Sequence, residues 1–439
     1  MVKFKRYRSY LVFALVFVGV LLASFSGSKS SQAAATTQQH RTRKTTVTCQ
    51  ALSTWISAPN PPQEIGNGVP IGDETNCQFY QFSWQWFLAL TQPTASGSDE
   101  RQFETFNIYQ PNVQNQCASP KPAGKAAASK ALFVRTLKAR TGNFEPTLPE
   151  DMAQATGQAL YDQAGNVVLY EVLYNSTECK ATSEGFLPNT TEIKISWRIL
   201  PGPNPNYYTM TANIPAISPN PITLGLVGFH LVINTADHPE FVWATFEHVA
   251  NDPDCTNPQV TPTGGWSFLS NFCYVCLAKS QQCPGCNFNT GQPSHSLTGP
   301  PTQVCRVFND GTDSGSMTGG NNNDVNRGNI DTLNAQITGP QGFLGQLPPS
   351  NPMSVWQNYK LVGGLWTNGG VGSGGTDVQR GSLENANTTM ETFFQQQGQN
   401  CFTCHGYDPT APLQVSHIIS DLLPPSQGGS KMKRQKILN

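Results

Sequence analysis

Cys401, Cys404 and His405 are the residues of this chain whose types and spacing most clearly predict chemistry. They form the motif Cys-Phe-Thr-Cys-His, in which two cysteines are separated by two residues and followed at once by a histidine. With 12 cysteines and 7 histidines among 439 residues, chance gives only about 0.005 matches to this pattern. In an exported chain the motif predicts one covalently bound haem c, because the two thiols add to the porphyrin vinyl groups and the imidazole of His405 ligates the iron.

The sixth iron ligand is not fixed by the sequence, and four residues are candidates: His417, Met390, His248 and His230. His417 follows the motif closely between apolar residues, although a histidine with no metal role fits the same position. Met390 lies on an apolar face of an expected helix, which favours core packing over ligation of the iron. His230 and His248 lie in two expected neighbouring strands. A hairpin symmetric about its loop puts these two on one sheet face about 13 Å apart, so at most one of them reaches the iron, and a one-residue slip changes this.

The first 35 residues carry the features of a signal peptide. Four basic residues precede an apolar run at 11–23, and the stretch ends in the small residues Ala33-Ala34-Ala35. The run is shorter than the ~20 residues that span a bilayer, so we expect a cleaved leader over 1–35 and a periplasmic or otherwise exported protein. An uncleaved N-terminal anchor is the alternative, because the polar stretch after residue 23 is long. No later segment is expected to span a membrane.

Charge and composition limit the possible partners. Without residues 1–35 the chain has 22 Lys and Arg against 28 Asp and Glu, a formal charge of −6 that weighs against nucleic acid. Charged residues make up only 13% of the chain, while glycine and proline are abundant. This composition predicts a strand-rich domain with many loops.

Ten cysteines lie outside the haem motif, an even number that predicts up to five disulfides in an oxidising compartment. Four of them, Cys273, Cys276, Cys283 and Cys286, have a spacing that could also supply thiolates to zinc or to an iron–sulfur cluster. We favour disulfides, because the six-residue spacer is short for a zinc ribbon and exported thiols are oxidised. The sequence does not define which cysteines pair.

The rest of the chain must form the scaffold for the haem, and its pattern predicts a mainly β (α+β) fold. Segments rich in Val, Ile, Tyr, Phe and Trp, bounded by turn residues, predict strands. These segments are 131–137, 166–174, 192–200, 207–213, 224–233, 241–249 and 359–366. No long helical period separates them, so we expect a largely antiparallel sheet with a hairpin joining 224–233 to 241–249.

Two helices are also expected. Aromatic residues at helical spacing predict a helix over 76–90 that packs in the core. A second helix is expected over 388–397, where Thr388 and Glu391 have the spacing of a capping box, and it leads the chain into Cys401.

Three regions follow from these patterns. They are the signal peptide at 1–35, a β-rich, disulfide-containing domain at 36–380 with long loops at 251–352, and a cytochrome c-like haem-attachment segment at 381–439. Only 34 residues follow His405, fewer than a self-contained small cytochrome c needs to surround its haem. We therefore expect the haem to lie against the preceding β domain.

Several phrases of the sequence, taken together, resemble a group of bacterial exported cytochrome c family proteins that carry one haem site near the C-terminus. The resemblance spans roughly residues 76–420 and rests on the phrases EIKISWR from 192, GFHLV from 228, VWATFEHV from 242, YKLVG from 359, NTTMETF from 387 and CFTCH from 401. It implies haem c binding and electron transfer in the periplasm, and it names no substrate. Within this span, the four-cysteine cluster and the Gly/Asn-rich loops have no match in the family.

Three functions remain open from the sequence. With two strong axial ligands the iron exchanges single electrons with a redox partner protein, which is the function we favour. With the sixth position open, the iron binds a small oxidant such as peroxide, O₂ or NO, and Glu247 or His248 could assist as an acid or base. The third possibility is a disulfide-rich binding domain in which haem is structural or sensory. No catalytic residue is assigned.

Overall fold

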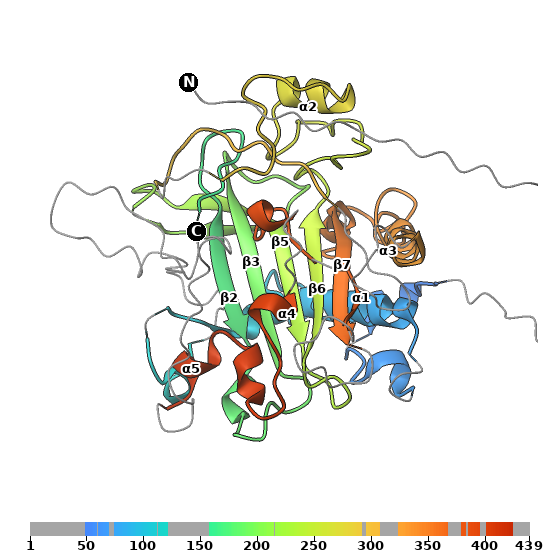
Figure 1. Ribbon diagram of the computed structural model, residues 1–439, viewed down its shortest axis with the longest axis vertical. Helices are drawn as coiled ribbons and strands as arrows, with labels where there is room; N and C mark the ends of the chain where they lie inside the picture. The colour runs from blue at the N-terminus through green and yellow to red at the C-terminus, as the bar shows by residue number, and fades with distance from the viewer. Residues whose placement is uncertain are drawn as a thin grey trace, which may run out of the picture. The chain divides into compact units, whose positions relative to one another are not determined.

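An antiparallel sheet forms the centre of the structure (Figure 1). The computed structural model describes residues 49–58, 60–69, 74–111, 113–121, 158–214, 216–291, 296–307, 324–367, 379–382, 385–395 and 401–424. All of them belong to one unit of the chain, which begins at residue 48. The predicted signal peptide at 1–35 and the predicted strand at 131–137 lie outside the described residues.

The sheet has eight strands, and every neighbouring pair is antiparallel. The strands are β1 (Asn107–Ile108), β2 (Leu169–Tyr174), β3 (Thr191–Leu200), β4 (Thr209–Ala212), β5 (Ile222–Ile233), β6 (Val242–His248), β7 (Tyr359–Thr367) and β8 (Gln379–Gly381). Their order is β1-β2-β3-β5-β6-β7-β8, and β4 pairs with β5 outside this path. The predicted mainly β, antiparallel fold is therefore confirmed.

The hairpin of β5 and β6 has a register one residue away from the symmetric expectation. His230 pairs with Thr245 rather than with Ala244, and the ladder ends at Ile233 opposite Val242. Phe241 has a left-handed backbone (φ 67°) and belongs to the loop, which shifts the centre of the hairpin. Since neighbouring side chains in a strand point to opposite faces, the expectation that His230 and His248 share one face is wrong.

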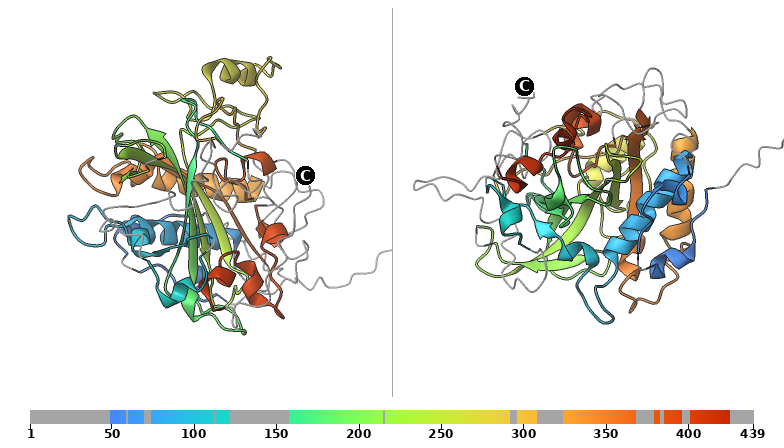
Figure 2. Two further views of the ribbon diagram at one scale, coloured as in Figure 1. Left: turned by 90° about the vertical axis from the view of Figure 1, so that its left-hand side faces the viewer. Right: turned by 90° about the horizontal axis from the view of Figure 1, so that it is seen from below.

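Helices cover one face of the sheet. Figure 2 shows α1 (Asn76–Thr91) and α3 (Asp324–Ile337) side by side on this face. The predicted helix at 76–90 is confirmed, and Thr75 begins it with a capping box to Gln78. Phe87 of α1 stacks on Phe246 of β6 with ring centroids 4.1 Å apart, so the aromatic stripe is core packing. The helix α3 lies in the region that we expected to be loop.

The C-terminal part of the chain covers the opposite face (Figure 2). It contains the short elements η10 (Thr392–Phe394), α4 (Cys401–Cys404), η11 (Pro412–Val415) and α5 (Ile419–Leu422). The helix predicted over 388–397 is wrong for the described residues 388–395, which form turns and the single 3-10 turn η10. Glu391 does not cap a helix; its carboxylate accepts from the Asn387 N–H and pairs with His230 of β5.

Five disulfides join the ten cysteines outside the motif, as predicted. The pairs are Cys49–Cys77, Cys117–Cys179, Cys255–Cys305, Cys273–Cys286 and Cys276–Cys283. The last two cross-link α2 (Asn271–Ala278) to the loop after it, at the top of Figure 1. The four-cysteine cluster is thus a pair of disulfides rather than a set of thiolate ligands.

The remaining short helices connect these layers. They are the 3-10 turns η1 (Ser53–Ser57), η2 (Ile65–Asn67), η3 (Gln102–Thr105), η4 (Gln116–Ala118), η7 (Glu178–Lys180) and η8 (Ser354–Asn358). Within the described ranges, no helix has the length and apolar character needed to cross a membrane.

Candidate haem-attachment site

The Cys-Phe-Thr-Cys-His motif lies on the sheet face that the C-terminal segment covers. Its cysteines begin and end the single helical turn α4, and the His405 N–H donates to the Cys401 carbonyl at 2.6 Å. Cys401 and Phe402 pack against an apolar cluster that includes Trp243 of β6 and Leu365 of β7. Figure 1 shows α4 in front of the sheet. The sheet therefore supplies an apolar wall beside the motif.

The imidazole of His405 has the arrangement that a metal-ligating histidine requires. Its Nδ1 lies 2.9 Å from the Val415 carbonyl oxygen, which accepts only from a protonated nitrogen. The proton therefore sits on Nδ1, and Nε2 keeps its lone pair for a metal, as in most protein metal sites. Burial, with a further contribution from His417, holds the pKa of His405 well below its usual range. The ring is neutral at pH 7 and able to ligate.

The two cysteines of the motif are also the two that the five disulfides leave out. The chain has 12 cysteines, and the five bonds use ten of them. The side chain of Asn385 contacts Cys401, with its amide nitrogen 4.0 Å from Sγ. Together with the neutral His405, this donor set fits covalent haem attachment in which His405 is the proximal ligand.

His417 lies beside His405 and not opposite it. The two rings are stacked, with centroids 3.6 Å apart and planes 14° from parallel. Rings in direct contact leave no space for a porphyrin between them, whereas axial ligands of one iron point their nitrogens at each other across the metal. In this structure His417 packs against the ring of His405, an arrangement that does not match that of a sixth ligand.

His248 and Met390 are placed away from any common iron site with His405. Both ring nitrogens of His248 have partners, because Nε2 lies 2.9 Å from the Asn206 carbonyl oxygen and Nδ1 accepts from the Ala250 N–H at 3.1 Å. Burial lowers the pKa of His248 to about 3, so its ring is neutral. Met390 is fully buried in the main apolar core.

His230 is the candidate that faces the C-terminal segment from the sheet. Its Nε2 lies 2.7 Å from a carboxylate oxygen of Glu391, and Lys194 of β3 lies 4.0 Å from the other oxygen. All three side chains are partly exposed. Burial alone would raise the pKa of Glu391, but His230 and Lys194 hold it below its usual range. Lys194 and His230 also help to lower the pKa of His405, which places them near the haem motif.

Glu247 and His248, either of which the sequence suggested as an acid or base, lie on opposite faces of the sheet. They are neighbours in β6, so their side chains point to opposite faces of the sheet. Glu247 is buried, forms an ion pair with Arg306 and accepts from the Thr388 N–H at 2.6 Å. This network holds the C-terminal segment on the sheet and is structural.

Sequence reasoning missed the cluster of Lys194, His230 and Glu391. The polar residues Glu192 and Lys194 alternate with Ile193 and Ile195 in β3, a signal that one face of this strand is polar. Nothing local predicted that Glu391 would reach His230, because 161 residues separate the two in the chain.

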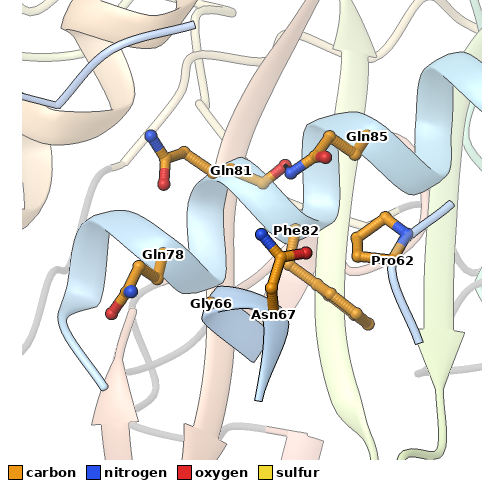
Figure 3. Close-up of a pocket in the computed structure, with 7 residues that line it drawn as sticks. All are labelled: Pro62, Gly66, Asn67, Gln78, Gln81, Phe82 and Gln85. Atoms are coloured by element: carbon orange, nitrogen blue, oxygen red, sulfur yellow. Dashed lines mark hydrogen bonds between the residues drawn. The ribbon is translucent and has the colours of Figure 1, made fainter. Parts of the chain in front are cut away.

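A separate cavity of about 130 Å³ lies between α1 and η2 (Figure 3). It is lined by Pro62, Gly66, Asn67, Gln78, Gln81, Phe82 and Gln85. None of these residues belongs to the haem motif or carries an ionisable side chain. Across the described ranges no group of three or more His, Cys, Asp or Glu is arranged to hold a metal ion by itself. A haem iron does not require such a group, because the porphyrin supplies four of its ligands.

Comparisons of the chain with protein-family models, with curated proteins and with solved structures found no match. The resemblance to exported cytochromes c therefore stays a prediction. The assignment of function depends on the motif and on the contacts of its residues.

Proposed function

We propose that this protein is an exported monohaem c-type cytochrome that transfers single electrons. The haem is bound covalently by Cys401 and Cys404, and His405 is its proximal ligand. The observation that carries the proposal is the Nδ1 contact of His405 with the Val415 carbonyl, which leaves Nε2 for iron next to the two cysteines. A bound haem supplies one-electron chemistry at a potential that ligands and burial set.

The residues around the motif would shape that chemistry. Trp243, whose ring lies 4.6 Å from that of His405, and Leu365 form an apolar wall that excludes water on one side. The neutral His405 is held in one tautomer, which fixes the direction of its lone pair. Such a rigid, apolar site suits electron transfer, because the ligands need little rearrangement when the iron changes charge.

The second candidate function is a haem-dependent enzyme or sensor with an open sixth position for peroxide, O₂ or NO. It is favoured by the positions of the four sixth-ligand candidates. His417 is stacked on the proximal ring, His248 and Met390 are buried elsewhere, and His230 is held by Glu391. With an open position, His230 and Glu391 would be the acid–base pair nearest to the motif, in place of Glu247 and His248.

The proposal is tested by producing the protein in a host with haem-ligation machinery and measuring its pyridine haemochrome spectrum after denaturation and acid–solvent extraction. We expect one covalently retained haem per chain in the wild type and none in the double variant Cys401→Ser/Cys404→Ser. The matched control, Cys276→Ser/Cys283→Ser, also loses two thiols but should retain the haem. A colourless wild-type chain would overturn the proposal.

Optical spectra of the native holoprotein separate the two candidate functions. A six-coordinate, low-spin iron that does not take up CO or cyanide would support electron transfer. A high-spin iron that binds CO readily would support the enzyme or sensor. In the second case, His230→Gln should slow the reaction with peroxide, because it removes the acid–base group.

A further inference from the structure

A buried glutamate and a half-buried one lie next to the segment that holds His405. Glu178 comes from η7 and Glu192 from β3, and Glu178 is fully buried. Tyr174 at the end of β2 pairs with Glu192 of β3, so the turn η7 that follows β2 brings Glu178 close to Glu192. The two carboxyl groups affect each other's pKa, and Ser416 lies close enough to affect both. Ser416 directly follows Val415, whose carbonyl accepts from His405. The pair is therefore adjacent to the segment that holds the His405 ring.

Among the described residues, no cation neutralises these carboxyl groups. Within the part of the chain that the structure describes, neither glutamate forms an ion pair with a lysine or arginine. Both oxygens of Glu178 and Oε1 of Glu192 are buried, and no hydrogen bond of good geometry reaches them. Burial, together with repulsion from Glu192, raises the pKa of Glu178 well above its usual range, and burial raises the pKa of Glu192. Two such groups in contact cannot both be charged, so the pair holds a shared proton.

The other ionisable side chains described near the pair do not donate this proton to it. The Tyr174 hydroxyl of β2 is buried near Glu178 and, among the described residues, has no hydrogen-bond partner. Burial and Glu178 raise the pKa of Tyr174 to about 12, so it stays neutral. Lys180 on η7 is exposed, Lys194 on β3 is engaged by Glu391, and Asp421 on α5 accepts from a tyrosine hydroxyl.

One short segment connects the pair to the proximal ligand. Val415 accepts from the His405 ring, Ser416 interacts with the two glutamates, and His417 stacks on His405. The consecutive residues Val415, Ser416 and His417 therefore link the glutamate pair to the ring of His405. In a buried region of low dielectric, a change of one charge at the iron acts strongly on an ionisable pair so close to it.

We propose that the Glu178–Glu192 pair takes up one proton when the iron held by His405 gains one electron, so that this protein couples electron transfer to proton transfer. The inference rests on the proposed haem function. The redox partner donates one electron, ferric iron becomes ferrous, and one proton passes from solvent to the shared carboxylate. The net charge of the site is then the same before and after. The pair titrates as a unit and not as two separate residues.

The test is the midpoint potential of the holoprotein measured against pH by spectroelectrochemistry. In the wild type we expect the ratio of reduced to oxidised iron, at a fixed electrode potential, to fall by up to tenfold per pH unit, equivalent to about 59 mV. This slope should disappear in Glu178→Gln and in Glu192→Gln. Glu184→Gln, which changes an exposed carboxylate between η7 and β3, is the matched control and should keep the wild-type slope.

Infrared difference spectra, reduced minus oxidised, test the inference on the wild-type protein alone, so the result does not depend on whether a variant folds. They should show a protonated carboxyl band that grows on reduction. A haem-bearing protein without this band, or with equal slopes in the wild type and both glutamine variants, would overturn the inference and leave the haem function intact. One tightly bound calcium per chain, lost in Glu178→Gln, would also overturn it, because a cation would then replace the proton. Absence of covalent haem would refute the proposed function itself.

Discussion

At the scale of single residues, the partners of each histidine decide what it can do. His405 has one ring nitrogen on a backbone carbonyl, which leaves the other nitrogen for a metal. His248 has both nitrogens occupied by backbone groups and is kept neutral by burial. His230 is bonded to the carboxylate of Glu391 through its Nε2 atom. The same side chain therefore serves as a ligand candidate, a core residue and half of an ion pair.

The stack of His417 on His405 leads to a residue-scale prediction. His417→Phe keeps an aromatic ring on His405 but removes both nitrogens, so we expect the visible spectrum of the oxidised holoprotein to stay unchanged. The unfolding free energy should change by less than about 1 kcal/mol, because the contact area is similar. His405→Phe is the control and should alter the spectrum. A change from low-spin to high-spin iron in His417→Phe would identify His417 as the sixth ligand.

Site residues could be predicted from the sequence where their role depends on neighbouring residues in the chain, and not where it depends on distant contacts. The motif at Cys401 was predicted because its chemistry needs only five consecutive residues. The placement of His230 relative to His248 depended on the hairpin register, which the left-handed Phe241 shifts by one residue. Glu178 carries no pattern in the sequence, since its role depends on a contact with Glu192 across the fold.

At the scale of elements, the glycines of β5 and β7 let the C-terminal segment lie directly on the sheet. A Cβ on Gly228 would lie 2.5 Å from both the Ser196 and the Thr389 hydroxyl oxygens. A Cβ on Gly363 would lie 2.4 Å from the Ser382 hydroxyl. Larger residues at these positions would lift the segment that leads to Cys401 away from the strands.

Gly228→Ala should therefore destabilise the protein by about 1–3 kcal/mol, the usual cost of overpacking a filled site. It should also lower the yield of covalent haem, because the displaced segment carries the motif. Urea unfolding and the haemochrome yield measure the two effects. The matched control is Gly202→Ala, where the added Cβ meets nothing within 4 Å. Equal behaviour of the two variants would show that close packing at Gly228 is not required.

The disulfides give a second prediction for the elements. Cys255–Cys305 closes 50 residues of chain and holds Arg306 next to Glu247, whereas Cys276–Cys283 closes only seven. Chain entropy alone then predicts a loss of about 4 kcal/mol for Cys255→Ala/Cys305→Ala and about 2 kcal/mol for Cys276→Ala/Cys283→Ala. Unfolding in urea under oxidising conditions would measure both. The reverse order would contradict this ranking.

The elements were predictable where the pattern and the packing agree. The helix α1 and the strands β3, β5 and β7 carry strong periodic signals, and each was predicted within a few residues. The helix expected at 388–397 did not form in its described part, because Glu391 is drawn to His230 and the chain is held flat against the sheet. The helix α3, which lies beside α1 on the sheet, has polar and apolar residues intermixed. Its sequence therefore gave little indication of which residues pack.

At the scale of the whole molecule, two buried groups predict opposite effects of pH on stability. Burial lowers the pKa of His248 to about 3, so its contribution is present above its unfolded value near 6.5 and is lost as the pH falls toward 3. We expect the free energy of unfolding to fall by a few kcal/mol across this range. His248→Gln should reduce the stability at pH 7 and flatten the acid limb, as measured by urea unfolding at several pH values. An acid limb as steep as that of the wild type would contradict the assignment.

The glutamate pair affects the free energy of unfolding at alkaline pH. The pKa of Glu178 is raised in the folded state, so its contribution is complete below the ordinary glutamate value near 4.3 and is lost as the pH rises through the folded value. Glu178→Gln has no charge to bury and should be more stable than the wild type at alkaline pH, by about 1–3 kcal/mol, with a smaller difference at acid pH. Glu184→Gln, whose carboxylate is exposed, should follow the wild-type profile throughout. The contrary outcome is that Glu178→Gln is less stable than the wild type by the same amount at every pH. That result would show that the Glu178 carboxyl of the wild type acts as a fixed hydrogen-bond acceptor. The glutamate pair that makes the fold sensitive to base is also the pair proposed to take up a proton with the electron, and its stability profile can be tested on protein that carries no haem.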